Sequence, residues 1–267
     1  MWEILQYEFM RNALAAGVLA SVACGIIGVL IVVKKIVSIS GGISHAAFGG
    51  IGLGYLMGFD PILGALFFAL ASALGMGVLR ERTRLSEDAA VGILWVTGMS
   101  LGVIFIGLAP GYAPDLFSYL FGSILTVPFL DLVVMAALDI VILLVVFLLY
   151  EEFMAISFDE SFATAAGVPV GRIYMVLLSL VALSVVVLIR IVGVILVIAM
   201  LTVPATIAWQ FSHRLKEMMA ISVLVSAIFT TEGLWLSYVF DLASGATIVL
   251  VSVATFVLSS ALKSLFK

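Results

Sequence analysis

Residues 128–150 read PFLDLVVMAALDIVILLVVFLLY, a run in which Asp131 and Asp139 are the only charged side chains. A helix needs about 20 mostly apolar residues to cross the hydrocarbon core of a bilayer, and this run is long enough to do so. Comparable runs recur along the whole chain, at approximately 13–33, 42–58, 61–79, 88–108, 128–150, 173–189, 193–210, 217–239 and 245–262. The sequence therefore predicts an all-α fold, a polytopic bundle of transmembrane helices.

The composition supports the same fold class. Of the 267 residues, 64% are hydrophobic and 10% are charged, whereas a soluble domain carries about 25% charged residues. So much apolar surface needs lipid as its solvent, and the lipid bilayer is the first predicted partner. The polar stretches between the runs are short, so we expect residues 1–267 to form a single transmembrane domain.

The number of spans depends on two places in the chain. The run at 42–58 is short and rich in glycine. The runs at 173–189 and 193–210 are separated by only three residues, beginning with Arg190, so they form either a tight hairpin or one broken element. We therefore expect eight or nine spans.

The basic residues predict an orientation. With nine spans, and with the loop that carries Lys34 and Lys35 in the cytoplasm, ten of the 12 Lys and Arg residues fall on the cytoplasmic side. Cytoplasmic loops of membrane proteins carry such an excess of basic residues. We expect a multi-pass protein of the cell (plasma or inner) membrane, with its N-terminus outside and its C-terminus in the cytoplasm.

A short helix is predicted at about 159–167, within a loop at 151–172. Asp159 is a good N-cap, Gly167 can adopt the left-handed conformation that ends a helix, and Pro169 prevents continuation. A helix this short rarely holds in water alone, so it should pack on something. It is either an ordered connection or a docking element for a cytoplasmic partner. The candidate docking residues are Phe158, Asp159, Glu160, Phe162 and Gly167.

Polar side chains inside the apolar runs are the candidate metal ligands. The stretch from Ser38 to His45 places three hydroxyl groups, two glycines and one imidazole where a span begins. Polar groups in a bilayer must face protein or water, and an imidazole nitrogen suits zinc. His45 is therefore either a metal ligand or a hydrogen-bonding residue in helix packing. The candidate helpers are Ser44, Asp139 and Glu232, although each carboxylate could equally belong to a structural ion pair.

Several kinds of function are excluded. The chain has no Gly-Lys pair and hence no Walker-type phosphate loop, so we do not expect it to hydrolyse ATP. It has no basic patch for nucleic acid, and with Cys24 as its only cysteine it can form no intrachain disulfide.

Gly50 and Gly54 have the spacing that allows two helices to pack closely.

Five motifs occur along nearly the full length of the chain. They are SHA at 44–46 with Gly49 and Gly50, EDAAVGI at 87–93, SYLFGSIL at 118–125, GVILVIAMLTVPAT at 193–206, and LSY at 236–238 leading to Asp241 and to SGA at 244–246. With these motifs the chain resembles the zinc, manganese and iron permease family of ATP-binding-cassette importers, whose fold is similar to that of the cobalamin importer permease.

The resemblance implies a homodimer with a translocation path at the dimer axis. It also implies separate ATPase subunits that dock on a coupling helix at about 159–167, and an extracytoplasmic binding protein that delivers the metal. The family usually has an aspartate four residues before the histidine, and that position is Gly41 here. The resemblance therefore carries over His45 but not its carboxylate partner.

The sequence leaves the transported metal open. Zinc is our first expectation because imidazole is the recognisable ligand, and manganese and iron remain alternatives. We expect no covalently bound cofactor. An ion-coupled secondary transporter that uses intramembrane carboxylates such as Asp139 is the alternative function. An intramembrane enzyme would need more nucleophiles or ligands than one intramembrane histidine and one cysteine.

Overall fold

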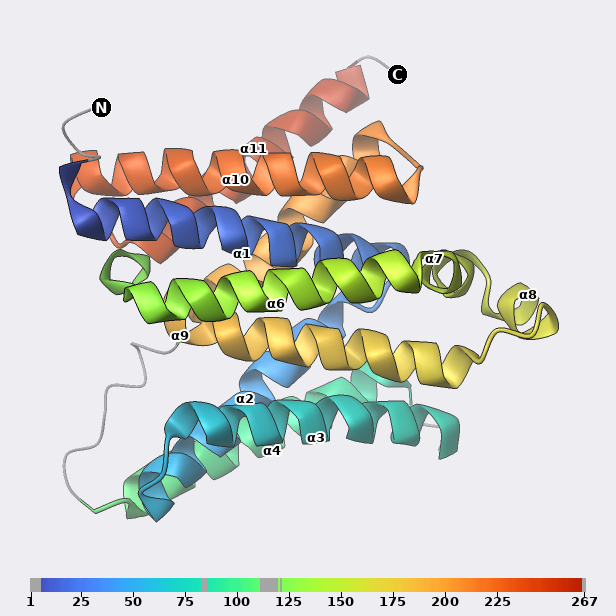
Figure 1. The fold of residues 1–267 in the computed structure, drawn as a ribbon, viewed down its shortest axis with the longest axis horizontal. Coiled ribbons are helices and arrows are strands. Elements are labelled where there is room, and N and C mark those ends of the chain that lie inside the picture. The colour runs from blue at the N-terminus through green and yellow to red at the C-terminus, as the bar shows by residue number, and fades with distance from the viewer. Residues whose placement is uncertain (1–5, 83–85, 111–119, 121, 266–267) are drawn as a thin grey trace. The chain divides into compact units, whose positions relative to one another are not determined.

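The structure is a computed structural model, and it describes residues 6–82, 86–110, 120 and 122–265, apart from the side chains of Glu81, Arg190 and Leu265. Within these ranges all the long elements are helices (Figure 1). They are α1 (Glu8–Val33), α2 (Val37–Met57), α3 (Pro61–Arg82), α4 (Glu87–Leu108), the 3-10 helix η2 (Ile124–Thr126), α6 (Phe129–Leu148), α7 (Tyr150–Phe158), α8 (Glu160–Ala165), α9 (Val170–Phe211), α10 (Leu215–Phe240) and α11 (Ser244–Leu265). The all-α prediction is confirmed.

Eight stretches among the described residues are long and apolar enough to cross a membrane. They correspond to eight of the nine predicted runs, with α9 supplying two of them, Val170–Ile189 and Ile191–Phe211. The remaining run corresponds to α2, which is a full helix of 21 residues but is not apolar enough to be counted with the others. The structure thus agrees with the prediction of eight or nine spans.

Helix α9 is one broken element. Its 42 residues are interrupted at Gly193, whose backbone has φ 78° and ψ 160°. Only glycine adopts this region of backbone space readily, because a Cβ atom would clash with the neighbouring carbonyl groups. The motif that begins at Gly193 therefore starts with the residue that breaks the helix.

Contacts divide the chain into two units, which are described separately. The first unit contains Met1–Val33, Phe117–Leu144 and Ile191–Lys267, and the second unit contains Lys34–Leu116 and Val145–Arg190. Helices α6 and α9 are each divided between the two units, α6 after Leu144 and α9 after Arg190.

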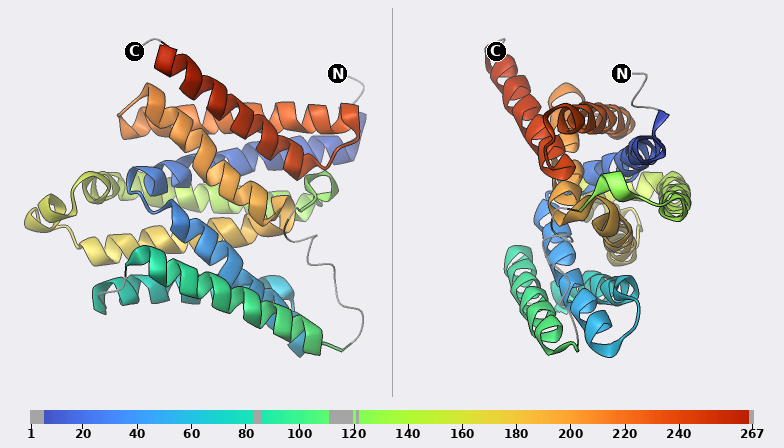
Figure 2. Two further views of the ribbon diagram at one scale, coloured as in Figure 1. Left: turned by 180° about the vertical axis from the view of Figure 1, so that it is seen from behind. Right: turned by 90° about the vertical axis from the view of Figure 1, so that its left-hand side faces the viewer.

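In the first unit, α10 packs between α1 and α11 (Figures 1 and 2). A Cβ atom placed on Gly25 of α1 would lie 2.8 Å from the backbone nitrogen of Val223 in α10. On the other side of α10, a Cβ atom on Gly233 would lie 2.7 Å from the Cα atom of Ile248 in α11. Small residues thus allow the three helices to approach each other closely, as in other membrane helix pairs.

In the second unit, α2 packs against both α3 and α4 (Figure 2). Gly50 faces the backbone of Gly64 in α3, and a Cβ atom on Gly54 would lie 2.6 Å from the Cα atom of Pro61. On the side toward α4, a Cβ atom on Gly52 would lie 2.6 Å from the carbonyl oxygen of Gly102. The predicted close packing at Gly50 and Gly54 is confirmed.

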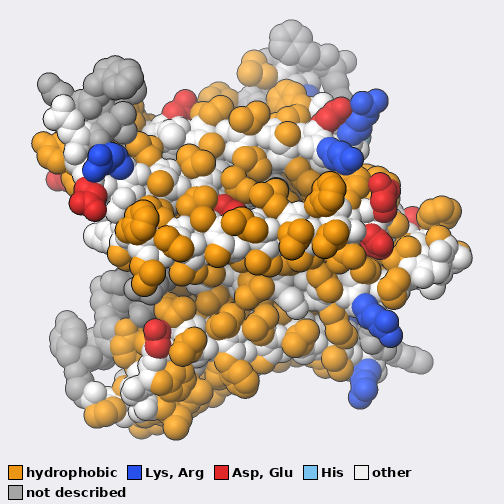
Figure 3. Space-filling model, in the orientation of Figure 1, with side chains coloured by type: hydrophobic (Ala, Val, Ile, Leu, Met, Phe, Trp, Pro, Cys, Tyr) orange, Lys and Arg blue, Asp and Glu red, His pale blue; other side chains and the backbone are white. Residues whose placement is uncertain are grey.

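The outer faces of the long helices carry large apolar side chains. In α6, for example, Phe129, Leu130 and Phe147 are 71%, 71% and 80% exposed. Figure 3 shows that hydrophobic side chains dominate the visible face over these helices, while charged side chains gather near helix ends. Such a surface is suited to contact with lipid acyl chains.

The segment expected to be a loop at 151–172 contains more helix than predicted. Residues Tyr150–Phe158 form α7 instead of a polar connection. Phe153 and Ile156 are 0% and 1% exposed, so α7 is anchored by an apolar face. The two residues are three positions apart, as expected for one face of a helix. The charged pair Glu151 and Glu152 made this segment resemble a polar loop in the sequence.

Candidate metal site and docking helix

His45 lies on α2, in the second unit. Its ring stacks on Trp95 of α4, with centroids 4.0 Å apart and an angle of 12° between the planes. The ring of Phe48 lies further away, at 6.2 Å. The Nδ1 atom of His45 is buried and has no hydrogen-bond partner among the described residues. The imidazole is therefore held flat against an aromatic surface, with one nitrogen that no described protein group satisfies.

The serines of the same stretch are satisfied by their own helix. The Ser44 hydroxyl donates to the carbonyl of Ser40 at 2.7 Å, and the Ser40 hydroxyl donates to the carbonyl of Val37 at 2.8 Å. Ser38 donates instead to Asp88 Oδ1 at 3.0 Å, and this bond joins the first turn of α2 to the first turn of α4. Each hydroxyl oxygen keeps acceptor capacity, so Ser44 can still offer an oxygen one position before His45.

The two candidate carboxylates belong to the first unit. Asp139 of α6 is 6% exposed, and its Oδ2 atom has no hydrogen-bond partner among the described residues. Glu232 of α10 is exposed. No group of three or more His, Cys, Asp or Glu residues that could hold a metal occurs in the described part of the chain. The roles of Asp139 and Glu232 as helpers therefore stay predictions, and the side chain of Arg190 lies outside the described residues.

The predicted short helix is present as α8. Asp159 is its N-cap, and its Oδ1 atom accepts a hydrogen bond from the backbone N–H of Phe162 at 3.0 Å. Gly167 follows the helix with a φ of 85°, as expected for a left-handed residue beyond a helix C-terminus. Phe158 and Phe162 are 59% and 68% exposed. Phe158 is the last residue of α7 and Phe162 lies in α8, so the junction of the two helices presents two largely exposed aromatic side chains.

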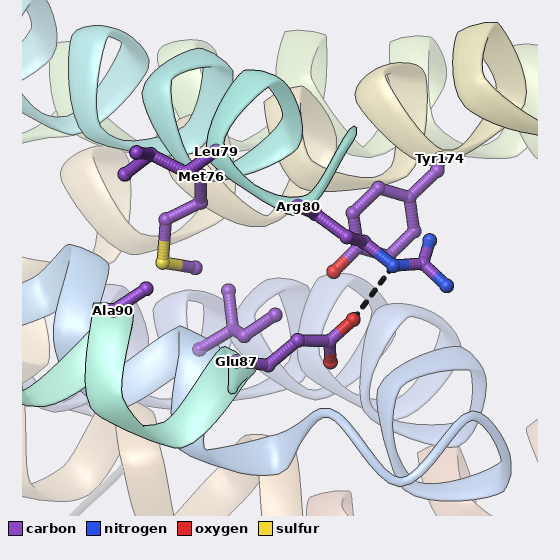
Figure 4. A pocket seen from close by; sticks show the side chains of 7 residues that line it. Met76, Leu79, Arg80, Glu87, Ala90 and Tyr174 are labelled. Carbon is purple, nitrogen blue, oxygen red and sulfur yellow. Dashed lines mark ion pairs between the residues drawn. The ribbon is translucent and has the colours of Figure 1, made fainter. Parts of the chain in front are cut away.

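Glu160 does not share that exposed face. Its carboxylate forms ion pairs with Lys34 and with Arg80, whose Nη2 atom lies 2.7 and 2.6 Å from the two carboxylate oxygens. Arg80 also pairs through Nε with Glu87 Oε1 at 2.8 Å (Figure 4). We call Lys34, Arg80, Glu87 and Glu160 the α8 ion-pair cluster.

Burial alone would raise the pKa of the Glu160 carboxyl. The hydrogen bonds and positive charges of Arg80 and Lys34 outweigh that effect, so the pKa lies below its ordinary value. The cluster was not predicted from the sequence. A usable signal existed, since Lys34, Arg80 and Glu87 all lie near helix ends on the side predicted to be cytoplasmic.

Comparison with known proteins identifies the family. The model of the ABC 3 transport family matches residues 6–263. An uncharacterized membrane protein of Synechocystis, slr2045, is 48% identical over 98% of this chain and 94% of that protein. The manganese transport system membrane protein MntC of Halalkalibacterium halodurans is 34% identical over 96% of this chain and 88% of its own length.

A solved structure shows the same fold. PsaBC from Streptococcus pneumoniae, determined in complex with Fab, superposes with a TM-score of 0.85 at 32% identity. The match covers 96% of this chain and 92% of that one. The family match favours the importer over the secondary transporter that the sequence left as an alternative. The chain belongs to the ABC 3 transport family, and it is a membrane permease subunit of a metal-ion importer, with ATP hydrolysis carried out by a separate subunit.

Proposed function

We propose that this permease moves divalent manganese into the cytoplasm, and that His45 lines the path. The observation that carries the proposal is the buried Nδ1 atom of His45, which has no hydrogen-bond partner among the described residues while the ring is stacked on Trp95. An unsatisfied imidazole nitrogen in an apolar surrounding is costly, and a passing cation would satisfy it.

The choice of manganese rests on relatives and on ligand chemistry. The relative from Halalkalibacterium halodurans is named as a manganese transport protein. Manganese prefers oxygen ligands, and α2 offers a single imidazole in place of the several that a zinc site uses. Zinc was expected from the imidazole alone, and the relative's name favours manganese instead. Iron, which shares these ligand preferences in part, is the second candidate.

A homodimer supplies what one copy lacks. The described residues of one chain contain no group of three metal ligands. If the path follows the shared axis of two copies, each contributes one His45 to the same ion. Two imidazoles then form part of the ligand set, and water on the ion takes the place of the carboxylate missing at Gly41.

The remaining parts of the proposal concern partners and topology. An ATPase subunit docks on α8 and the end of α7 through Phe162 and Phe158, whose exposed rings fit an apolar groove on a partner. An extracytoplasmic binding protein delivers the metal to the opposite side. Residues 1–267 act as a single permease domain, with the N-terminus outside and the C-terminus in the cytoplasm.

The decisive test is His45→Ala in the complete transporter. We expect uptake of radioactive manganese to fall strongly, while the amount of folded permease and its assembly with the ATPase stay nearly normal. His213→Ala is the matched control, because His213 is exposed in the connection between α9 and α10. If His45 only supports packing, the variant would instead yield less folded protein with unchanged uptake per molecule.

Two further measurements separate the alternatives. Competition of manganese uptake by zinc and iron ranks the three metals, and a stronger effect of either competitor than of unlabelled manganese would change the assigned cargo. The purified permease without its partners should hydrolyse no ATP, and activity in such a preparation would contradict the division into subunits.

A further inference from the structure

The inner face of α8 is tied to other elements of the second unit through Lys34 and Arg80. Glu160 and Ala163 are three residues apart, so they share one side of this short helix. Ala163 is 0% exposed, and Glu160 holds the α8 ion-pair cluster, whereas Phe162 points outward and is 68% exposed. One side of α8 is thus anchored while the other is available to a partner.

Lys34 fixes the segment between α1 and α2. Its side chain is only 5% exposed, which is rare for lysine and requires full pairing. The Nζ atom donates to the carbonyl of Ile156 in α7 at 2.9 Å and pairs with Glu160 in α8. The residue three positions before the start of α2 is therefore bonded to both helices of the docking segment.

Arg80 links α8 to three further helices. It stands near the end of α3, and it pairs with Glu160 of α8 and with Glu87 in the first turn of α4. Its guanidinium also lies 4.3 Å from the centroid of the Tyr174 ring, near the start of α9. Figure 4 shows Arg80, Glu87 and Tyr174 at one edge of a small pocket, whose apolar lining includes Met76, Leu79 and Ala90. Apolar surroundings strengthen such ion pairs by reducing the screening by water.

The helices that receive these contacts pack too tightly to slide past one another. A Cβ atom on Gly98 of α4 would lie 3.0 Å from the carbonyl oxygen of Ala46, the residue after His45. Gly50 and Gly64 bring the backbones of α2 and α3 into direct contact in the same way. Closely packed helices transmit a displacement instead of absorbing it. These contacts form a continuous chain from α8 to the helix that carries His45.

We propose that the α8 ion-pair cluster is the mechanical link between ATPase docking and the metal path. Glu160 is a positioning residue, which acts through Arg80 and Lys34 and touches neither metal nor nucleotide. The inference rests on the proposed function, because it assumes that α8 receives the ATPase and that α2 lines the path.

The test measures manganese uptake and ATP hydrolysis together, in vesicles containing the complete transporter. Glu160→Gln keeps the shape of the side chain and removes its charge. We expect ATP hydrolysis to continue while the metal moved per ATP falls about fivefold or more, the effect of a typical coupling energy between two sites. Glu151→Gln is the matched control, since Glu151 is an exposed residue of α7, and this variant should keep the wild-type ratio.

A double substitution identifies the pair that acts. Arg80→Gln should lower the same ratio, and Glu160→Gln with Arg80→Gln together should lower it by less than the sum of the two single effects, because both remove the Glu160–Arg80 pair. Arg80→Lys keeps the positive charge without the planar fork, so it should restore part of the ratio.

The outcomes separate this inference from the proposed function. If wild-type vesicles import no manganese, the proposed function fails. If they import it and Glu160→Gln keeps the wild-type ratio of uptake to hydrolysis, the link does not run through Glu160. A purely structural role would lower both rates in proportion to the folded protein and leave their ratio unchanged. Because the ratio refers to the folded fraction alone, a variant of low yield still decides the question.

Discussion

The contact between α2 and α3 can be tested with two glycines of the same helix. Gly64 and Gly75 both lie in α3. A Cβ atom on Gly64 would overlap the carbonyl oxygen of Gly50 and lie 2.8 Å from its carbonyl carbon. A Cβ atom on Gly75 would have nothing within 4 Å. Replacement by alanine therefore adds the same methyl group at a crowded position in Gly64→Ala and at an open position in Gly75→Ala.

The expected difference can be worked out from these surroundings. Carbon atoms attract one another at about 3.5–4.0 Å, so Gly64→Ala forces the two backbones apart by about 1 Å. No side chain can rotate away, because the obstructing atoms belong to the backbone of Gly50. Overpacking of this kind costs about 1–3 kcal/mol. Both variants also gain about 1 kcal/mol of helix propensity, so their difference isolates the clash.

The assay is unfolding of the purified permease in mixed micelles by increasing amounts of SDS, followed by circular dichroism. We expect Gly75→Ala to unfold at a higher SDS fraction than the wild type. Gly64→Ala should be less stable than Gly75→Ala by about 1–3 kcal/mol. Equal shifts in the two variants would show that α2 and α3 do not touch at Gly50, and would remove the basis for a rigid block around His45.

Three further predictions concern the path and the docking helix. Gly41→Asp places a carboxylate one helical turn before His45, and it should tighten manganese binding and slow release, as measured by binding and uptake of radioactive manganese. An unchanged affinity would mean that the ion passes elsewhere. Phe162→Asp should prevent the ATPase from copurifying while the unfolding midpoint changes little, since exposed substitutions usually stay within about 0.5 kcal/mol. The lowered pKa of Glu160 means that its ion pairs stabilise the fold above the ordinary glutamate pKa of about 4.3, and that this stabilisation is lost as pH falls through the lower folded value. The stability gap between wild type and Glu160→Gln should therefore be constant from pH 8 to about 5 and close in more acidic buffer, and a gap that closed near neutral pH would contradict this.

The local features of the chain could be predicted well from the sequence because they depend on local physics. Apolar runs are long enough to identify the spans, and Asp159 and Gly167 define the ends of α8 by their own backbone preferences. The glycine pair in α2 correctly indicated a close helix contact. Each of these signals lies within a few residues of the feature that it specifies.

The ion-pair cluster could not be predicted in the same way. Glu160 lies 126 positions from Lys34 and 80 positions from Arg80 along the chain. A charge at a helix end is normally interpreted as a solvated residue, and nothing local indicates that its partner sits on another helix. Glu160 was therefore assigned to the docking surface, although its carboxylate is directed at the permease itself.

The least apolar run of the chain forms α2, the helix that carries His45. Glycine and serine lower the hydropathy of α2, so that it falls below the level typical of a membrane span. The same glycines allow the backbones of α3 and α4 to approach α2 on two sides, and most of α2 is buried as a result. A helix covered by protein needs no large apolar side chains to face lipid, in contrast to α6 with its exposed Phe147. Low hydropathy and burial in α2 therefore have the same cause, its glycines, and burial is also what permits an imidazole to be held within it. In a chain of this kind, the span that is hardest to detect by hydropathy is the first place to look for the transported ion.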